Sequence, residues 1–323
     1  MCTAISYKSV DHYFGRNLDM EYSYDERVTI TPRNYQFNFR YAEGPENQHA
    51  MIGMAYIQED YPLYYEAANE RGLSMAGLNF PGYADYKPYA EGFDNVAPFE
   101  LIPWVLSQCS SIDDAKSLLS RTNLIYQDFS ANLPATPLHW MISDRHSSIV
   151  VEPLRFGLKI YDNPANVLTN SPSFDIHMWH LNNYMSLSPY DPMQNMASKL
   201  NLNCYSHGMG ALGLPGDLSS SSRFIRAVYT LTNSVSSAHE EENVIEFFHI
   251  LGSVAMSKGS VYYNGKPEYT LYSSCCNASR GIYYYKTYGN SQITSIHMHK
   301  EALDSSKLIS YELTSGPQIL TGN

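Results

Sequence analysis

The stretch MCTAISYKSVDHYFGRNLDM, residues 1–20, decides the fold, because it combines two strand-forming runs with a cysteine at the second position. TAISYKS (3–9) and HYFGRNLDM (12–20) are separated by a short polar turn, which predicts an antiparallel hairpin. The second strand would bring Arg16 and Asp19 back beside Cys2, since paired residues in a hairpin lie about 5 Å apart. A surface ion pair at a strand end is the alternative role for these two side chains.

Cys2 has the chemistry of a terminal nucleophile. If Met1 is removed, Cys2 carries both a thiol and a free α-amine. An α-amine has a pKa of ~7.7–8.0 and a thiol one of ~8.5, so the amine can accept the thiol proton near neutral pH. A small residue after the initiator methionine is also common in proteins without this chemistry, so position alone does not establish a catalytic role.

Composition excludes several classes of function. The formal net charge of −11 argues against a nucleic-acid partner, because phosphate binding needs clustered Lys and Arg. The five cysteines are odd in number and irregularly spaced, which favours neither a disulfide framework nor a zinc site. No basic, apolar leader and no apolar run of about 18 residues is present, so we expect a cytoplasmic protein without a membrane partner.

The order of expected elements indicates an α+β fold. Strand patterns fill the first 80 residues, helical periodicity covers 97–121, and strands resume before an irregular stretch at 172–222. Two further helices, SSSSRFIRAVYTLTN (219–233) and HEEENVIEFFHILGSVAM (239–256), precede a last group of strands. Strict βαβ alternation is absent, so we expect two packed antiparallel sheets with helices outside them.

Two familiar motifs do not carry a function here. GMGALG (208–213) has the literal G-x-G-x-x-G spacing, but it lacks the preceding strand and following helix that a dinucleotide site needs. No G-x-S-x-G occurs, so a serine hydrolase of that kind has no nucleophile elbow.

Several longer strings resemble the choloylglycine hydrolase family of N-terminal nucleophile (Ntn) amidohydrolases, and most of all its bacterial bile salt hydrolases. The similarity runs nearly end to end. It comprises MCT (1–3), FGRNLD (14–19), ITPRNY (30–35), AGLNFPGY (76–83), LHWMISD (138–144), VLTNSP (167–172), LGLPGD (212–217), SRFIRA (222–227) and EFFHIL (246–251).

The resemblance implies a four-layer αββα sandwich that forms a single domain over residues 1–323. It also implies hydrolysis of the amide between a bile acid and glycine or taurine, through a thioester on Cys2, with no metal and no cofactor. By this resemblance the matched positions include the nucleophile and the two residues that set its thiol and amine. They also include two oxyanion donors and an arginine near the reacting centre. They are Cys2, Arg16, Asp19, Asn79, Asn170 and Arg223.

The same resemblance implies a substrate pocket and an assembly. The acyl pocket would be lined by Leu18, Tyr24, Phe129, Leu133 and Thr136. Segment 181–215 matches the family's assembly loop, which implies a homotetramer. The expected partners are therefore a small-molecule bile acid conjugate and further copies of this chain.

Other functions remain open from the sequence. Penicillin V acylase and N-acyl homoserine lactone acylase would use the same mechanism on other acyl groups, although Asn79 stands where penicillin V acylases usually carry Tyr. A non-catalytic protein that binds small ligands on the same fold is the alternative from another class. Loss of amide hydrolysis in Cys2→Ala separates the enzymes from the binding protein.

Overall fold

The computed structural model describes residues 1–45 and 48–323, and the expected hairpin forms the middle of one of its two large sheets. β1 (Cys2–Lys8) pairs with β2 (His12–Met20) in antiparallel register. The sheet runs β12-β1-β2-β14-β15-β16, and β13 also pairs with β14. The other strands of this sheet are β12 (Val167–Leu168), β13 (Val261–Tyr263), β14 (Lys266–Asn277), β15 (Ile282–Thr287) and β16 (Asn290–His297).

The second large sheet has eight strands in the order β11-β10-β9-β6-β5-β4-β3-β17, and all neighbours are antiparallel. A separate pair, β7 (Asp94–Val96) and β8 (Thr122–Leu124), is parallel. The eight strands are β3 (Arg27–Thr31), β4 (Met51–Gln58), β5 (Tyr61–Asn69), β6 (Ser74–Asn79), β9 (Leu138–Ser143), β10 (Ser148–Leu154), β11 (Gly157–Asp162) and β17 (Ile309–Glu312).

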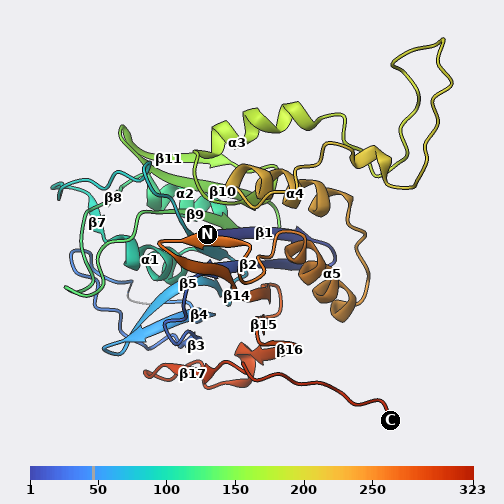
Figure 1. Ribbon diagram of the computed structural model, residues 1–323. Coiled ribbons are helices and arrows are strands. Elements are labelled where there is room, and N and C mark those ends of the chain that lie inside the picture. The colour runs from blue at the N-terminus through green and yellow to red at the C-terminus, as the bar shows by residue number, and fades with distance from the viewer. Residues whose placement is uncertain (46–47) are drawn as a thin grey trace.

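Helices cover the outer faces of both sheets, which confirms the predicted four-layer αββα arrangement (Figure 1). α1 (Leu101–Gln108) packs on β5 and β6 of the eight-stranded sheet, and α2 (Ile112–Leu119) lies beside it. On the other sheet, α4 (Ser220–Asn233) and α5 (Glu240–Gly252) pack on β1 and its neighbours. No helix within the described residues has the length and apolar character needed to cross a bilayer.

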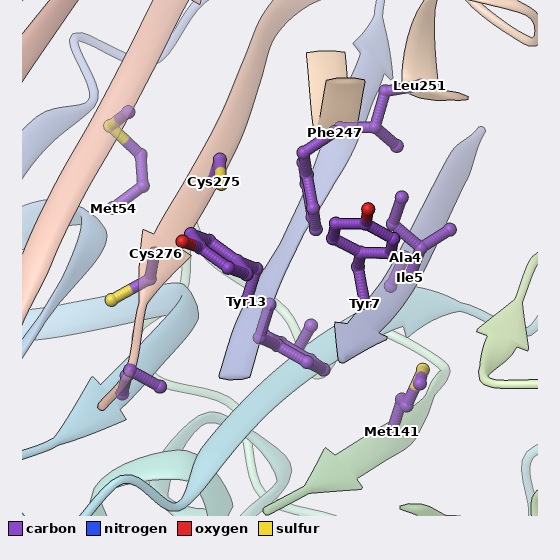
Figure 2. Close-up of a cluster of buried hydrophobic side chains, with 14 of the residues drawn as sticks. Ala4, Ile5, Tyr7, Tyr13, Met54, Met141, Phe247, Leu251, Cys275 and Cys276 are labelled. Atoms are coloured by element: carbon purple, nitrogen blue, oxygen red, sulfur yellow. The ribbon is translucent and has the colours of Figure 1, made fainter. Parts of the chain in front are cut away.

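The strands around Cys2 are buried on both faces, because a sheet lies on one side of them and helices on the other. Figure 2 shows Phe247 and Leu251 of α5 beside Tyr7 of β1, while Met54 and Met141 extend from strands of the opposite sheet. The side chains of these strands are therefore shielded from bulk water on both faces of the sheet. The hairpin places Cys2 at the edge of this buried region, and the N-terminus lies among the central strands in Figure 1.

One expectation for the middle of the chain was wrong. Residues 172–222 were expected to be irregular, but α3 (Phe174–Leu181) begins two residues after Pro172 and packs on α4. Its apolar residues are spread around the helix and do not form a clear stripe, so the periodicity that predicts a helix is weak here. Beyond α3 the chain is largely irregular and projects from the body of the molecule before α4 begins (Figure 1).

Candidate active site

The hairpin register puts Arg16 and Asp19 on different sides of the strand that pairs with Cys2. Cys2 lies opposite Leu18 and Ala4 lies opposite Arg16. Directly paired residues share a face, so Arg16 projects with Cys2 into the space between the two sheets. Asp19 belongs to the other face, toward the helices. The two residues can therefore act on different parts of Cys2: Arg16 faces the thiol, and Asp19 faces the main-chain nitrogen.

Both side chains are buried, so the alternative of a surface ion pair is wrong. Arg16 is 1 % exposed and Asp19 is 0 % exposed. The Arg16 Nη1 donates to the carbonyl oxygens of Gly77 at 2.5 Å and Tyr65 at 3.1 Å. Burial lowers the pKa of Arg16, but the nearby Cys2, Tyr272 and Glu66 side chains raise it more, so the net shift is upward. Arg16 is thus a fixed cation beside the thiol.

Met1 is present in the structure and occupies the end of the hairpin. Its α-amine donates to the main-chain oxygen of Asp19 at 2.6 Å and forms an ion pair with Glu268. The Asp19 main-chain nitrogen donates in turn to the Met1 carbonyl at 2.9 Å. Burial lowers the pKa of this amine below its usual value. This shift belongs to the Met1 amine, because the Cys2 nitrogen is in a peptide bond while Met1 is present.

The Asp19 carboxylate has one oxygen bound and the other free. Thr270 Oγ1 donates to Oδ1 at 2.6 Å, whereas Oδ2 is buried without a hydrogen-bond partner among the residues that the structure describes. Burial raises the pKa of Asp19, and the positive charge of Arg223 opposes that shift. A buried oxygen without a partner is costly. This oxygen is available to accept from an amine on Cys2.

Asn170 and Arg223 meet at the Cys2 main chain. Asn170 Oδ1 accepts from the Cys2 nitrogen at 2.9 Å and from Arg223 Nη2 at 2.7 Å. The Arg223 Nη1 also donates to the Cys2 carbonyl at 2.5 Å and to Thr3 Oγ1 at 2.7 Å. Two donors on Oδ1 fix the orientation of the Asn170 amide, and its Nδ2 group faces away from Arg223.

The Asn170 Nδ2 donates to the main-chain oxygen of Asn79 at 2.8 Å, which brings the two expected oxyanion residues together. Asn79 ends β6 and its side chain is exposed. The contact uses one of the two hydrogens on Nδ2 and leaves the other for a substrate oxygen. The structure thus joins Cys2, Arg223, Asn170 and Asn79 in one continuous set of contacts.

The residues that hold Asn170 could not be identified from the sequence. Its main-chain nitrogen donates to Ser220 Oγ at 2.9 Å, and its carbonyl lies 2.9 Å from His177 Nε2. Burial lowers the pKa of His177 to about 4, so the ring is neutral and Nε2–H donates to the carbonyl. His177 lies on α3, and the missed helix explains why this contact could not be expected.

The five expected pocket residues occupy two regions. Leu18 is buried directly opposite Cys2, and Tyr24 lies on the loop after β2, with its ring against Tyr56. Phe129 and Leu133 close a tight turn between β8 and β9, where the Phe129 nitrogen donates to the Leu133 carbonyl at 3.0 Å. The Thr136 carbonyl accepts from Tyr86 at 2.7 Å on the same loop.

A groove of about 600 Å³ opens elsewhere, between the ends of the two sheets at Ser23, Tyr269 and Glu312. None of the five expected pocket residues lines it. The groove therefore gives no support to their assignment, and their role stays a prediction.

Comparisons with known proteins identify the family of this chain. Residues 2–311 match the family of linear amide C–N hydrolases, choloylglycine hydrolase family. The chain is 53% identical to a bile salt hydrolase/transferase of Lactiplantibacillus plantarum, with both chains covered in full, and 40% identical to one of Clostridium perfringens over 97% of each chain.

Solved structures show the same fold. The crystal structure of the C2A mutant of a conjugated bile acid hydrolase from Clostridium perfringens superposes with a TM-score of 0.91 at 38% identity, over the whole of both chains. A penicillin V acylase from Agrobacterium tumefaciens gives a TM-score of 0.76 at 18% identity, over 97% of this chain and 92% of that one, which shows a shared fold alone. The predicted Ntn-hydrolase fold is confirmed, and the chain belongs to the choloylglycine hydrolase family of linear amide hydrolases.

Proposed function

We propose that this enzyme hydrolyses conjugated bile salts at the amide bond to glycine or taurine. The observation that carries the proposal is the position of Cys2, whose main-chain nitrogen contacts Asn170 and whose side chain shares a face with Arg16. Full-length identity of 53% to a bile salt hydrolase/transferase supports the choice of substrate.

The proposed cycle begins with removal of Met1. The new α-amine of Cys2 keeps Asn170 Oδ1 as an acceptor and gains the free Oδ2 of Asp19. It takes the thiol proton, and Arg16 stabilises the resulting thiolate from the same face of the hairpin. Met1 must leave, because in a peptide bond the Cys2 nitrogen has no lone pair that can accept a proton.

The thiolate then attacks the amide carbonyl, and a carbon–sulfur bond forms as the oxygen becomes an anion. The second Nδ2 hydrogen of Asn170 and a donor from Asn79 stabilise this oxyanion, a contribution of about 2.7–4 kcal/mol for each donor in comparable enzymes. The Cys2 ammonium gives its proton to the nitrogen of the leaving glycine or taurine as the carbon–nitrogen bond breaks, which leaves the acyl group on Cys2 as a thioester. The neutral amine then takes a proton from the attacking water, the carbon–sulfur bond breaks, the bile acid leaves, and the Cys2 sulfur regains its proton from the amine. No metal and no cofactor takes part in this scheme.

The bile acid would lie against Leu18, Tyr24, Phe129, Leu133 and Thr136, as the family resemblance suggests. Leu18 supports this reading best, because it is the direct partner of Cys2 in the hairpin. Apolar contacts suit a steroid, whose recognition depends mainly on buried apolar area.

We further propose that residues 1–323 form one domain and that segment 181–215 packs against other subunits of a homotetramer. The segment exposes several large apolar side chains, namely Met185, Tyr190, Met193, Met196, Leu200, Leu202, Tyr205 and Leu212. Exposed apolar area on this scale is typical of an interaction surface. The enzyme would act in the cytoplasm on bile lipids, without nucleic-acid or membrane partners. Light scattering on the purified protein tests the tetramer, and a monomer at micromolar concentration contradicts it.

Substrate competition tests the proposed function. Rates on glycocholate, taurocholate, penicillin V and an N-acyl homoserine lactone should rank a conjugated bile salt first. A higher kcat/KM on penicillin V or on the lactone would assign the enzyme to that acylase activity instead.

Cys2→Ala tests catalysis against mere ligand binding. Cys2→Ala should abolish hydrolysis, whereas Cys204→Ala, which removes an exposed thiol, should leave the rate unchanged. Equal activity of Cys2→Ala and the parent would remove Cys2 from the mechanism, and absence of hydrolysis in the parent would favour a binding protein.

A further inference from the structure

A buried carboxylate in the middle of β5 lies between the two sheets, close to the active site. Glu66 is 2 % exposed. Its Oε1 accepts from Ser274 Oγ at 2.8 Å and from Tyr283 OH at 2.5 Å, and its Oε2 accepts from Tyr272 OH at 2.8 Å. Glu66 thus receives three hydroxyl donors from β14 and β15 of the opposite sheet. The catalytic scheme above does not use any of these four side chains.

Glu66 also faces Arg16, but it does not hold the guanidinium in place. The Arg16 Nε lies 3.9 Å from Glu66 Oε2, within ion-pair range and beyond a hydrogen bond. The hydrogen bonds of Arg16 to Gly77 and Tyr65 use a different nitrogen, Nη1. Loss of the Glu66 charge would therefore leave those two bonds intact.

The contacts indicate that Glu66 is ionised. An ionised carboxylate can only accept hydrogen bonds, and Glu66 contacts three hydroxyl groups that can donate to it and one guanidinium. Burial raises the pKa of Glu66 on balance, because Arg16 and the three hydroxyl groups offset only part of that shift. A buried carboxylate with a guanidinium and three donors has the partners that its charge requires.

We propose that Glu66 is a positioning residue that moderates the positive field of Arg16 at the Cys2 thiol; the proposal rests on the nucleophilic role proposed for Cys2. The charged groups around Cys2 are Arg16 and Asp19 from β2, Arg223 from α4, the terminal α-amine and, behind Arg16, Glu66 from β5. Tyr272 from β14 also lies near Arg16.

The chemical reason is the balance between thiolate population and reactivity. Two buried guanidinium groups, Arg16 and Arg223, both interact with Cys2. Cations favour the thiolate, but the nucleophilicity of a thiolate falls as its basicity falls. A carboxylate next to one guanidinium reduces the positive electrostatic field at the Cys2 sulfur, so the thiolate stays basic enough to attack an amide.

The test uses Glu66→Gln, which keeps the size and removes the charge. Cys2 alkylation by iodoacetamide is followed as a function of pH, with peptide mass spectrometry to separate Cys2 from the other thiols. We expect the pH midpoint of Cys2 alkylation to move down by about one unit, since Arg16 is then less compensated. The matched control is Glu70→Gln, which breaks the Glu70–Arg33 ion pair four residues further on and should leave the midpoint unchanged.

A second variant asks whether Glu66 acts through Arg16. Without Arg16, the buried Glu66 should be protonated, so Arg16→Gln/Glu66→Gln should have the same midpoint as Arg16→Gln alone. An unchanged or higher midpoint in folded Glu66→Gln overturns the proposal, and so does a further shift in the Arg16→Gln background. If Glu66→Gln does not fold, Tyr283→Phe removes one donor and should move the midpoint down by less; no movement then overturns the proposal.

This readout is independent of the proposed substrate. Because alkylation needs no bile salt, the result for Glu66 does not depend on the identity of the acyl group. Failure of Cys2 to react with iodoacetamide at any pH would instead contradict the nucleophilic role of Cys2 itself.

Discussion

The Arg223 Nη2 donates to Asn170 Oδ1 at 2.7 Å, and this contact determines which way the Asn170 amide faces. A reversed amide would place two N–H groups against a guanidinium, which is unfavourable. Arg223 is 0 % exposed. It also donates hydrogen bonds to the Cys2 carbonyl, to Thr3 Oγ1 and to the Leu218 carbonyl. One side chain thus fixes both the Cys2 backbone and the Asn170 amide.

Arg223→Lys should therefore lower kcat much more than it raises KM. A single ammonium cannot reproduce the planar set of contacts to Asn170, Cys2 and Thr3. We expect a loss of roughly 10²-fold in kcat, comparable to the loss of one oxyanion donor. Steady-state kinetics on glycocholate measure it, with circular dichroism to confirm folding. A folded Arg223→Lys enzyme with parental kcat would show that the Asn170 orientation does not depend on Arg223.

Asn170→Asp tests the oxyanion donor directly. The substitution keeps Oδ1 as an acceptor for Arg223 and the Cys2 nitrogen, but it replaces the Nδ2 donor with a second oxygen. We expect kcat to fall by about 10²–10³-fold. Asn166→Asp, at a half-buried position before β12 where Oδ1 accepts from Ser148 Oγ and is kept, is the control and should change kcat by less than about twofold. Equal kinetics for the two variants would remove Asn170 from the oxyanion site.

The pH profile tests the role of Asp19. Burial lowers the pKa of the Met1 α-amine and the negative charge of Asp19 opposes that shift; we expect both effects to act on the Cys2 α-amine that replaces it. Removing the charge lowers the amine pKa further, so more of the amine stays neutral in acid. The acid limb of kcat/KM should therefore move to lower pH in Asp19→Asn, by about one unit. A shift of that limb to higher pH would contradict the assigned contact.

Stability should depend on the layer that buries the hairpin. Phe247 on α5 is 0 % exposed and packs with Tyr7, as Figure 2 shows. Phe247→Ala should lower the free energy of unfolding by about 3–5 kcal/mol. Phe156→Ala, at a side chain that is 97% exposed, should change it by less than about 0.5 kcal/mol. Urea denaturation of both variants gives the comparison, and equal destabilisation would contradict the packing described.

Local signals explain what could be predicted from the sequence. The hairpin, most strands of the two packed sheets and four of the five helices in residues 1–45 and 48–323 followed from alternation, periodicity and turn residues, whereas β13 and β17 were not expected. In α2, Ser111 caps the helix by accepting from the Asp114 nitrogen. The family resemblance supplied the site residues, and the structure brings Cys2, Arg16, Asp19, Asn170 and Arg223 together.

The remainder depends on contacts between distant segments. Thr270 reaches Asp19 because β14 pairs with β2 and a register shift follows Thr270. Glu66 reaches Arg16 because β5 and β2 face one another across the two sheets. Residue spacing and composition do not indicate such contacts, because each contact joins strands that lie far apart in the chain.

The N-terminal residue of the active enzyme tests the central claim most directly. Protein is prepared from cells with and without an inhibitor of methionine removal, and intact mass is measured alongside the rate on glycocholate. The account predicts that activity follows the fraction of chains that begin with Cys2, and that a homogeneous Met1 form is inactive. Full activity in chains that all retain Met1 would contradict it.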